Sequence, residues 1–254
     1  MRTAVTRPVP ASLARCELTH LARVPIDIDV AVAQHERYEE ALRVLGCAVR
    51  HVPAADELPD SLFVEDAAIV LDEVAIITRP GAPSRRPECE AVAHVLAEYR
   101  PLQTIAAPGT IDGGDVLRLG RTLYVGRSTR SNADGIRQLS ACVAPFGYSV
   151  VEVRTADCLH LKSAVTAVDA DRVICNPDWI DARVLTGVDV IAVDPAEPHA
   201  ANVLRVGHAI VCAAQYERTV ADLRSRGYDV CAVDVSELAK AEAGVTCCSV
   251  IIEE

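Results

Sequence analysis

The sequence predicts an α/β protein in which five similar units repeat radially. Five times, a polar signature opens a short apolar strand, a tight turn follows, and a second apolar strand leads toward a helix. Successive signatures lie roughly 40 to 50 residues apart, the period of arrays, propellers and solenoids. The signatures are Glu65-Asp66, Asp112-Gly113-Gly114-Asp115, His160-Leu161-Lys162, Ala201-Asn202 and Cys247-Cys248. If the units close around an axis, these polar residues converge on one point.

The fifth unit is split between the two ends of the chain. Residues 247–252 supply its first strand, residues 2–6 supply another, and a helix over residues 35–45 closes it. In that helix Tyr38, Ala41, Leu42 and Leu45 recur at the i, i+3, i+4, i+7 spacing, and Gly46 is a suitable C-cap. Joining the two termini in one unit leaves few open sheet edges.

Four further helices are expected after the other strand pairs. One begins near Pro87, one is capped by Asn132, and one runs through residues 215–227, whereas the third unit offers only residues 177–185. Their inward stripes are Val92, Val95 and Leu96, then Ile136, Leu139 and Val143, then Tyr216, Val220 and Leu223. No low-complexity linker interrupts residues 1–254, which predicts a single domain.

A doubly wound α/β sheet is the alternative fold. Its parallel strands require single strands to alternate with helices, whereas this sequence repeats strand pairs. The pattern therefore favours radial repetition.

Composition excludes several classes of function. Half of the 254 residues are apolar and 24% are charged, as in ordinary globular proteins. No apolar run reaches the roughly 18 residues of a membrane span, and the first residues read as a strand, so we expect a cytoplasmic protein without a membrane partner. The net charge of −11, with no basic stripe, disfavours nucleic acid and suits a cationic small molecule.

The chain has ten cysteines, but their spacing does not suit a metal site or a disulfide framework. No C-x-x-C occurs. Eight cysteines are scattered singly, and we expect them to act as small buried hydrophobes: Cys16, Cys47, Cys89, Cys142, Cys158, Cys175, Cys212 and Cys231.

Each signature residue has an ordinary structural reading when it is taken singly. His160 starts an apolar strand, and Asp112 before two glycines is compatible with a simple turn. Glu65 and Asp66 either form a solvated strand start or are paired, because unpaired acids beside an apolar strand are costly. Of Cys247 and Cys248, at most one faces a pocket, since side chains alternate along a strand.

Taken together, the signatures contain a cysteine, a histidine and several carboxylates. A thiolate can act as a nucleophile, a histidine can move protons, and a carboxylate can orient that histidine. The additional acids Glu65 and Asp66 would bind something positive and planar, such as a guanidinium.

Several stretches along nearly the whole chain resemble the dimethylarginine dimethylaminohydrolase family of the guanidino-group-modifying, or pentein, superfamily. They are SLFVEDAAIV, AIITRPGAPSRR, IDGGDVL, LYVGRSTRSNADG, LHLKS, AANVL and GVTCCSVII. The resemblance implies a five-bladed α/β propeller with pseudo-fivefold repeats, the pentein fold.

The resemblance also implies a role for individual residues. The nucleophile falls on Cys247, the general acid/base on His160 and the histidine-orienting acid on Asp112. The substrate-binding residues fall on Leu18 of a lid loop, Asp60, Phe63, Glu65, Asp66, Arg85, Arg130, Ser163 and Ala241, with Arg85 and Arg130 on the α-carboxylate. One departure is that Glu242-Ala243 precede Gly244 where the family commonly has Asp-Gly.

The implied reaction is hydrolysis of Nω-methylated arginine to citrulline and a methylamine through a covalent cysteine intermediate. It needs no metal and no organic cofactor, and a homodimer is compatible with it. The alternatives are an arginine deiminase-like hydrolase, an amidinotransferase and a non-catalytic propeller that binds a partner. The chain lacks the extra length typical of the first two, and a binding module has no use for a nucleophile.

Overall fold

The computed structural model describes residues 1–253 and, within them, contains five separate three-stranded sheets. In every sheet the middle strand pairs antiparallel with the first strand and parallel with the third. The sheets are β15–β1–β2 (Val250–Glu253, Arg2–Thr6, Cys47–His51), β3–β4–β5 (Ala68–Val70, Ala75–Ile77, Leu102–Thr104), β6–β7–β8 (Val116–Leu119, Thr122–Arg127, Ser149–Arg154), β9–β10–β11 (Val165–Ala167, Arg172–Cys175, Asp189–Ala192) and β12–β13–β14 (Leu204–Val206, Ala209–Ala213, Asp229–Val233). The predicted repeat is confirmed, and the alternative of one doubly wound sheet is wrong.

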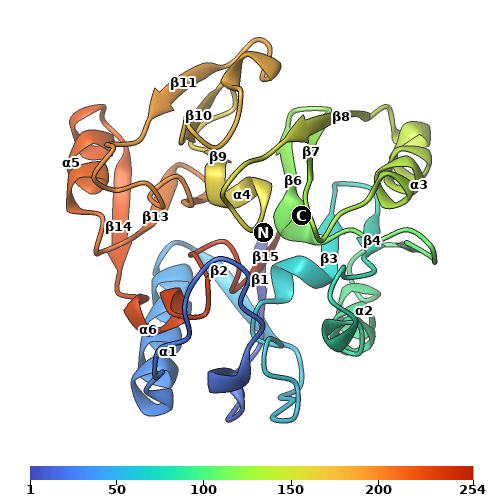
Figure 1. Cartoon of the computed structure of the whole chain (residues 1–254), viewed down its shortest axis with the longest axis horizontal. Helices are drawn as coiled ribbons and strands as arrows, with labels where there is room; N and C mark the ends of the chain where they lie inside the picture. The colour runs from blue at the N-terminus through green and yellow to red at the C-terminus, as the bar shows by residue number, and fades with distance from the viewer. Residues whose placement is uncertain (254) are drawn as a thin grey trace.

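The five sheets lie around a central region, and the longer helices lie on the outside (Figure 1). Both termini lie near the centre because β1 pairs with β15, with Ala4 opposite Ile251. On its other side β1 pairs in parallel with β2, where Ala4 lies opposite Val49. The predicted split unit is therefore confirmed.

Helix α1 (Ile28–Val44) is longer than the sequence pattern predicted. It begins at the N-cap Asp27, whose side chain accepts a hydrogen bond from the Val30 amide at 3.1 Å. The expected start at residue 35 was wrong, because the apolar spacing is clear only in the second half of the helix. The C-terminal prediction was better, since Gly46 follows the C-cap with a φ of +88°.

Three outer helices agree with expectation: α2 (Glu88–Leu96), α3 (Ala133–Val143) and α5 (Glu217–Ser225). Asn132 caps α3, accepting a hydrogen bond from the Gly135 amide at 2.8 Å. In the third unit, residues 177–185 form no α-helix, only the 3₁₀ turn η6 (Ala182–Val184). Of the helices in residues 1–253, none combines the length and the hydropathy needed to cross a bilayer.

Three of the five polar signatures form single helical turns rather than strand starts, whereas residues 201–202 and 247–248 lie in no helix. The 3₁₀ turns η2 (Val64–Ala67) and η4 (Gly113–Asp115) and the short helix α4 (Leu161–Ala164) directly precede β3, β6 and β9. The remaining short elements are η1 (Leu13–Arg15), η3 (Pro83–Arg85), η5 (Ala144–Phe146) and α6 (Ser236–Ala239). Because η2 packs on η4, a Cβ on Gly113 would lie 2.0 Å from the Glu65 carbonyl oxygen. These turns bring the signature side chains toward one another.

Candidate active site

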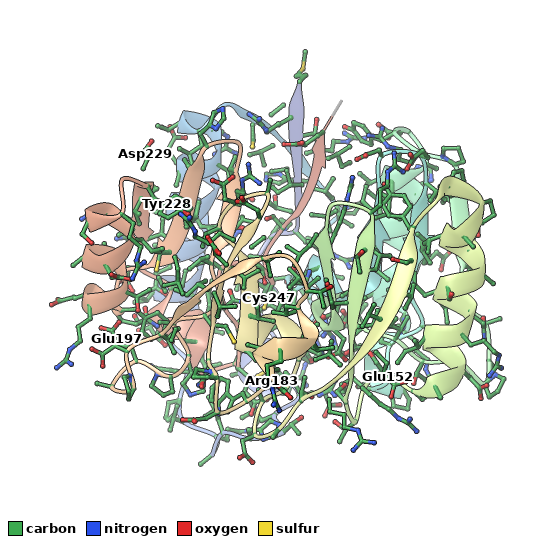
Figure 2. The ribbon with its side chains drawn as sticks, turned by 90° about the horizontal axis from the view of Figure 1, so that it is seen from above. Glu152, Arg183, Glu197, Tyr228, Asp229 and Cys247 are labelled. Carbon is green, nitrogen blue, oxygen red and sulfur yellow. The ribbon has the colours of Figure 1, made fainter. Side chains whose placement is uncertain are left out.

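The signature residues predicted to carry chemistry meet near the middle of the molecule. Figure 2 shows Cys247 between the surrounding sheets. The Glu65 amide donates to the Cys247 carbonyl oxygen at 3.2 Å, which ties η2 to the segment before β15. Glu65, Asp66 and His160 are buried, and Cys247 is partly exposed. The predicted convergence is therefore present, whereas the catalytic roles stay predictions.

His160 lies between two carboxylates. Its Nε2 is 3.1 Å from Asp112 Oδ2, and its Nδ1 is 3.8 Å from Asp66 Oδ1. Burial alone would lower the pKa of His160, but Asp66, Asp112 and Asp115 outweigh it and raise the pKa to about 9. The imidazole is therefore protonated at neutral pH and able to donate a proton.

The glycines after Asp112 let the backbone approach these side chains closely. A Cβ on Gly114 would lie 2.7 Å from both His160 Nδ1 and Asp66 Oδ1. The Gly114 amide also donates to Asp66 Oδ1 at 2.9 Å. Glycine is therefore required at position 114, since any larger residue there would displace His160 and Asp66.

The two adjacent cysteines have different surroundings. Cys247 Sγ accepts a hydrogen bond from the Gly244 amide at 3.3 Å. Cys248 is buried and packs in the hydrophobic cluster that contains Tyr38 and Leu42. Burial, Glu65 and Asp66 raise the pKa of the Cys247 thiol to about 12. The site without a cation therefore holds a thiol rather than a thiolate.

Glu65 is held by residues that sequence reasoning did not single out. Lys162 Nζ lies 2.5 Å from Glu65 Oε1, and Thr246 Oγ1 donates to Glu65 Oε2 at 2.7 Å. Asn202 supports this pair, since its amide donates to the Lys162 carbonyl and to Thr246 Oγ1, each at 3.0 Å. The signal was available: Lys162 and Asn202 stand in two signatures, and Thr246 precedes Cys247.

Arg85 and Arg130, which were expected to act alike, lie in different environments. Arg85 is buried, with Nη1 2.6 Å from Asp66 Oδ2 and Nη2 2.9 Å from Glu88 Oε2, and it also donates to the carbonyls of residues 60 and 63. Burial alone would raise the pKa of Asp66, but His160 and Arg85 bring it below its usual range. Arg85 thus has a structural role, and its contact with a substrate stays a prediction.

Arg130 lies instead beneath the N-terminal loop of residues 16–25. Its Nη2 donates to Thr19 Oγ1 at 3.2 Å, and Nη1 is 3.9 Å from Asp112 Oδ2. Asp60 accepts from the Glu17 amide at 3.1 and 3.2 Å, which places Leu18 between two anchored residues. The predicted lid loop therefore contacts Asp60 and Arg130 directly.

Glu242 anchors the same loop from the opposite side. Its carboxylate accepts hydrogen bonds from the amides of Thr19 at 3.0 Å and of His20 and Leu21 at 2.5 Å. The side chain extends from a residue with a φ of +59°, next to the buried Ala241. Glu242, where this sequence departs from the common Asp-Gly of the family, thus contacts the lid loop. The sequence alone did not indicate this contact.

Comparison with known proteins identifies the family. Residues 49–198 match the arginine deiminase family. The N(G),N(G)-dimethylarginine dimethylaminohydrolase of Streptomyces coelicolor is 42% identical, and the match covers 98% of this chain and 96% of that protein. This chain belongs to the dimethylarginine dimethylaminohydrolase family, within the pentein superfamily.

Two solved structures of the family resemble the whole fold. A cysteine-to-serine variant of the Pseudomonas aeruginosa enzyme in complex with citrulline is 32% identical, with a TM-score of 0.94 and 98% of each chain covered. A histidine-to-glycine variant in an adduct with S-methyl-L-thiocitrulline is also 32% identical, with a TM-score of 0.94, covering 99% of this chain and 100% of that one.

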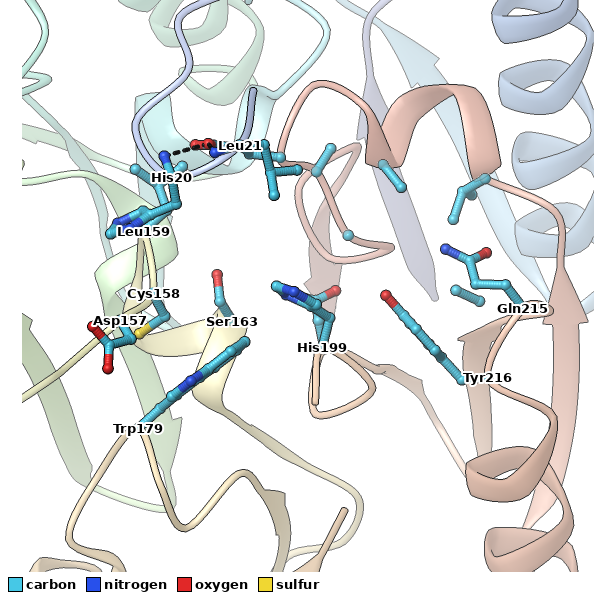
Figure 3. Close-up of a pocket in the computed structure, with 17 residues that line it drawn as sticks. His20, Leu21, Asp157, Cys158, Leu159, Ser163, Trp179, His199, Gln215 and Tyr216 are labelled. Atoms are coloured by element: carbon cyan, nitrogen blue, oxygen red, sulfur yellow. Dashed lines mark hydrogen bonds between the residues drawn. The ribbon is translucent and has the colours of Figure 1, made fainter. Parts of the chain in front are cut away.

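A cavity of about 300 Å³ lies next to this group of signature residues (Figure 3). Cys247 itself does not line it. Ser163, Asn202 and Gly244 line it on the side of Cys247, and the Gly244 amide is the one that contacts the sulfur. A Cβ on Gly244 would lie 2.2 Å from Asn202 Oδ1, so this position requires glycine. The other walls include His20, Leu21, Trp179, His199 and Tyr216. Phe63 does not line this cavity, and its ring packs in the core.

Asp66, Asp112 and His160 form a group with the spacing of metal ligands, since their ligand atoms lie within 4.8 Å of one another. The chemistry of the group favours ion pairs instead. Asp66 is already paired with Arg85, and His160 is in its protonated form, which cannot ligate a metal through a ring nitrogen that carries a proton. The prediction that the family member works without a metal stays a prediction.

Proposed function

We propose that the protein hydrolyses Nω-methylated arginine, as asymmetric dimethylarginine or monomethylarginine, to citrulline and dimethylamine or methylamine. The observation that carries the proposal is the meeting of Cys247 and His160 with the buried acids Glu65, Asp66 and Asp112. Against the effect of burial these acids raise the pKa of His160, and together with burial they raise the pKa of Cys247. Its relatives bear the name of this activity, and one of them was solved with citrulline. We also propose that the five sheets form a five-bladed propeller with pseudo-fivefold symmetry.

The acids bind the guanidinium before chemistry begins. Asp66 Oδ1 faces His160 and the Gly114 amide, whereas Oδ2 is taken by Arg85. Glu65 is oriented by Lys162 and Thr246. At the other end of the substrate, Arg130 holds the α-carboxylate, and Asp60 and Leu18 hold the amino group. The predicted role of Arg85 on the α-carboxylate is not part of this proposal, because its guanidinium is bound to Asp66 and Glu88. Ser163, which lines the cavity, completes the binding site, and Phe63 and Ala241 support it from the core.

Binding of the cation activates the nucleophile. A unit positive charge about 4 Å from the sulfur contributes roughly 4 kcal/mol at an effective dielectric constant of about 20. That energy lowers a pKa by about 3, since each pKa unit corresponds to about 1.4 kcal/mol. The pKa of Cys247, about 12 in the empty site, then approaches the range in which a thiolate is populated, and the thiol proton leaves to solvent.

Cys247 Sγ attacks the guanidinium carbon, and the protonated His160 donates its proton to the departing methylamine. A covalent thiouronium remains on the sulfur. His160, now neutral, takes a proton from water as the oxygen attacks the same carbon. Cleavage of the carbon–sulfur bond releases citrulline, and Asp112 keeps the ring oriented throughout.

Citrulline release from a panel of guanidino compounds by the purified protein tests the proposal. We expect turnover of monomethyl- and asymmetric dimethylarginine, with little from free arginine. A preference for free arginine would favour the arginine deiminase alternative. The match of residues 49–198 to the arginine deiminase family makes this comparison necessary. Citrulline from no compound would favour a non-catalytic propeller.

We also propose a cytoplasmic location, which we infer from the sequence. A homodimer is compatible with the proposed reaction. Sedimentation of the purified protein measures the assembly directly, because a dimer has twice the mass of the 27.1 kDa chain.

A further inference from the structure

Asp115 is a fully buried acid for which the proposed reaction has no use. It lies on η4, three residues after Asp112, and none of its surface is exposed. Its carboxylate accepts three hydrogen bonds. Ser128 Oγ and Ser131 Oγ each donate to Oδ2 at 2.6 Å, and the Leu161 amide donates to Oδ1 at 3.0 Å.

The two serines connect Asp115 with the loops that carry Asp112 and Arg130. Ser131 Oγ donates to Asp115 and accepts from the Asp112 amide at 3.1 Å. Ser128 Oγ donates to Asp115 and accepts from the Arg130 amide at 3.0 Å. One hydroxyl therefore separates Asp115 from each of these two backbone segments.

The third hydrogen bond fixes the histidine. Leu161 directly follows His160 and is the first residue of α4, so its amide is one of the free donors at the start of that helix. On the other side, a Cβ on Gly126 of β7 would lie 2.7 Å from Asp115 Oδ1. The Asp115 side chain is thus confined from β7 while it holds the backbone beside His160.

We propose that Asp115 is a positioning residue of the active site, whose single carboxylate sets the relative placement of Asp112, Arg130 and His160. The proposal rests on the proposed function for the roles of those three residues. Asp115 touches none of the reacting atoms and acts through the two serines and the Leu161 amide.

The charge of Asp115 also acts on His160. The charged groups that face His160 are Asp66 from η2 and Asp112 and Asp115 from around η4. Burial raises the pKa of Asp115 to about 6, with His160 and the serine hydroxyls opposing the rise, so the carboxylate is largely ionised at neutral pH. Removing this charge should lower the pKa of His160.

The Asp115→Asn variant is the sharpest test, since it keeps the shape of the side chain. All three partners donate to the carboxylate, whereas an amide offers one acceptor oxygen and an NH₂ that must face a donor. We expect kcat/KM for methylated arginine to fall about 10- to 100-fold, the range for losing a hydrogen bond to a charged group. We also expect the His160 pKa, followed by NMR of the imidazole nitrogens and assigned with His160→Gln, to fall.

Glu39→Gln is the matched control. Glu39 is also a buried acid, but its partners Thr6, His51 and Arg43 lie away from the proposed site. This variant should unfold at a lower temperature, with the kcat/KM and the His160 titration of the wild type. A folded Asp115→Asn protein whose kcat/KM and His160 pKa match the wild type would overturn the proposal. Lower stability with an unchanged His160 titration would also overturn it, because the role would then be structural.

If Asp115→Asn fails to fold, Ser131→Ala replaces it. This variant removes one donor to Asp115 and the acceptor of the Asp112 amide, and we expect a fall of about 10-fold in kcat/KM. An unchanged kcat/KM in folded Ser131→Ala would contradict the proposal. The His160 titration needs no turnover, so a wild-type protein without activity on methylated arginine would refute the proposed function and leave the placement test intact.

Discussion

The two walls of the proposed active site differ in charge. On η2, on η4 and at the N-cap of η4 stand four buried acids. Three of them are matched with a cation: Asp66 with Arg85, Glu65 with Lys162, and Asp112 with His160. The adjoining wall, residues 244–248 with Ser163 and Asn202, carries no ionised side chain, and its thiol is protonated. In the acid wall, Glu65 and Asp66 oppose ionisation of the Cys247 thiol. We therefore expect the site to react only when a cationic substrate lies beside the thiol.

The largest effect should come from the thiol wall itself. Cys247→Ser should reduce citrulline release below detection, because a serine hydroxyl beside these acids is a far poorer nucleophile than a thiolate. Cys248→Ser is the matched control, and it should retain substantial activity, since Cys248 packs in the core. Equal inactivation by both substitutions would show that the two cysteines are not distinguished as the structure suggests.

His160→Gln should remove the proton donor and acceptor of the proposed reaction. We expect a loss of about 10²- to 10⁴-fold in turnover, the usual contribution of acid–base catalysis. The sulfur can still attack the guanidinium carbon, so a covalent adduct on Cys247 should accumulate and be visible by mass spectrometry. Turnover at the wild-type rate would remove His160 from the mechanism.

Substitutions of Arg130 and Arg85 should have different effects, the first on substrate binding and the second on folding stability. Arg130→Ala should raise KM for methylated arginine about 10- to 200-fold, since one charge-assisted hydrogen bond contributes roughly 1.5–3 kcal/mol. The effect should be much smaller for guanidines that lack a carboxylate. Its midpoint of thermal unfolding should change little, since the ion pair of Arg130 with Asp112 is long, at 3.9 Å.

Arg85→Ala should behave differently, because it leaves Asp66 and Glu88 buried without their cation. Breaking such a pair costs roughly 3–5 kcal/mol of folding stability. Thermal unfolding of the two variants side by side distinguishes them. Equal stability would mean that Arg85 does not support the acid wall.

The smallest effect concerns the lid. Glu242→Ala removes the acceptor of three amides in residues 19–21. Because these contacts are exposed, we expect a rise in KM of about 3- to 10-fold, with kcat little changed. Hydrogen exchange at the amides of Thr19, His20 and Leu21 should be faster in the variant. Unchanged exchange would show that Glu242 does not hold the loop.

Much of this arrangement could be predicted from the sequence because the repeat places its polar residues at equivalent positions. The pattern predicted the joined termini and the meeting of Cys247 with His160 and Asp112. It did not predict the single helical turns at the signatures, because three or four residues show no helical period. It also did not separate Arg85 from Arg130, since the pairing of Arg85 with Asp66 depends on how α2 packs against η2.

Supporting residues were the hardest to predict. Asn202 and Lys162 have no chemistry of their own in the repeat, and their importance depends on contacts with Thr246 and Glu65 that only the fold creates. Asp115 was visible as part of a signature, but its three donors come from the loop between β7 and α3 and from the start of α4.

The state of the Cys247 thiol in the empty enzyme decides whether the substrate activates its own nucleophile. Ultraviolet titration of thiolate, with Cys247→Ser as the blank, should give a pKa for Cys247 well above the ordinary cysteine value of about 8.5, because burial, Glu65 and Asp66 raise it. A cationic substrate analogue should lower that pKa. A pKa below about 7 in the empty enzyme would contradict the account, since it would mean a permanent thiolate–imidazolium pair that needs no cation.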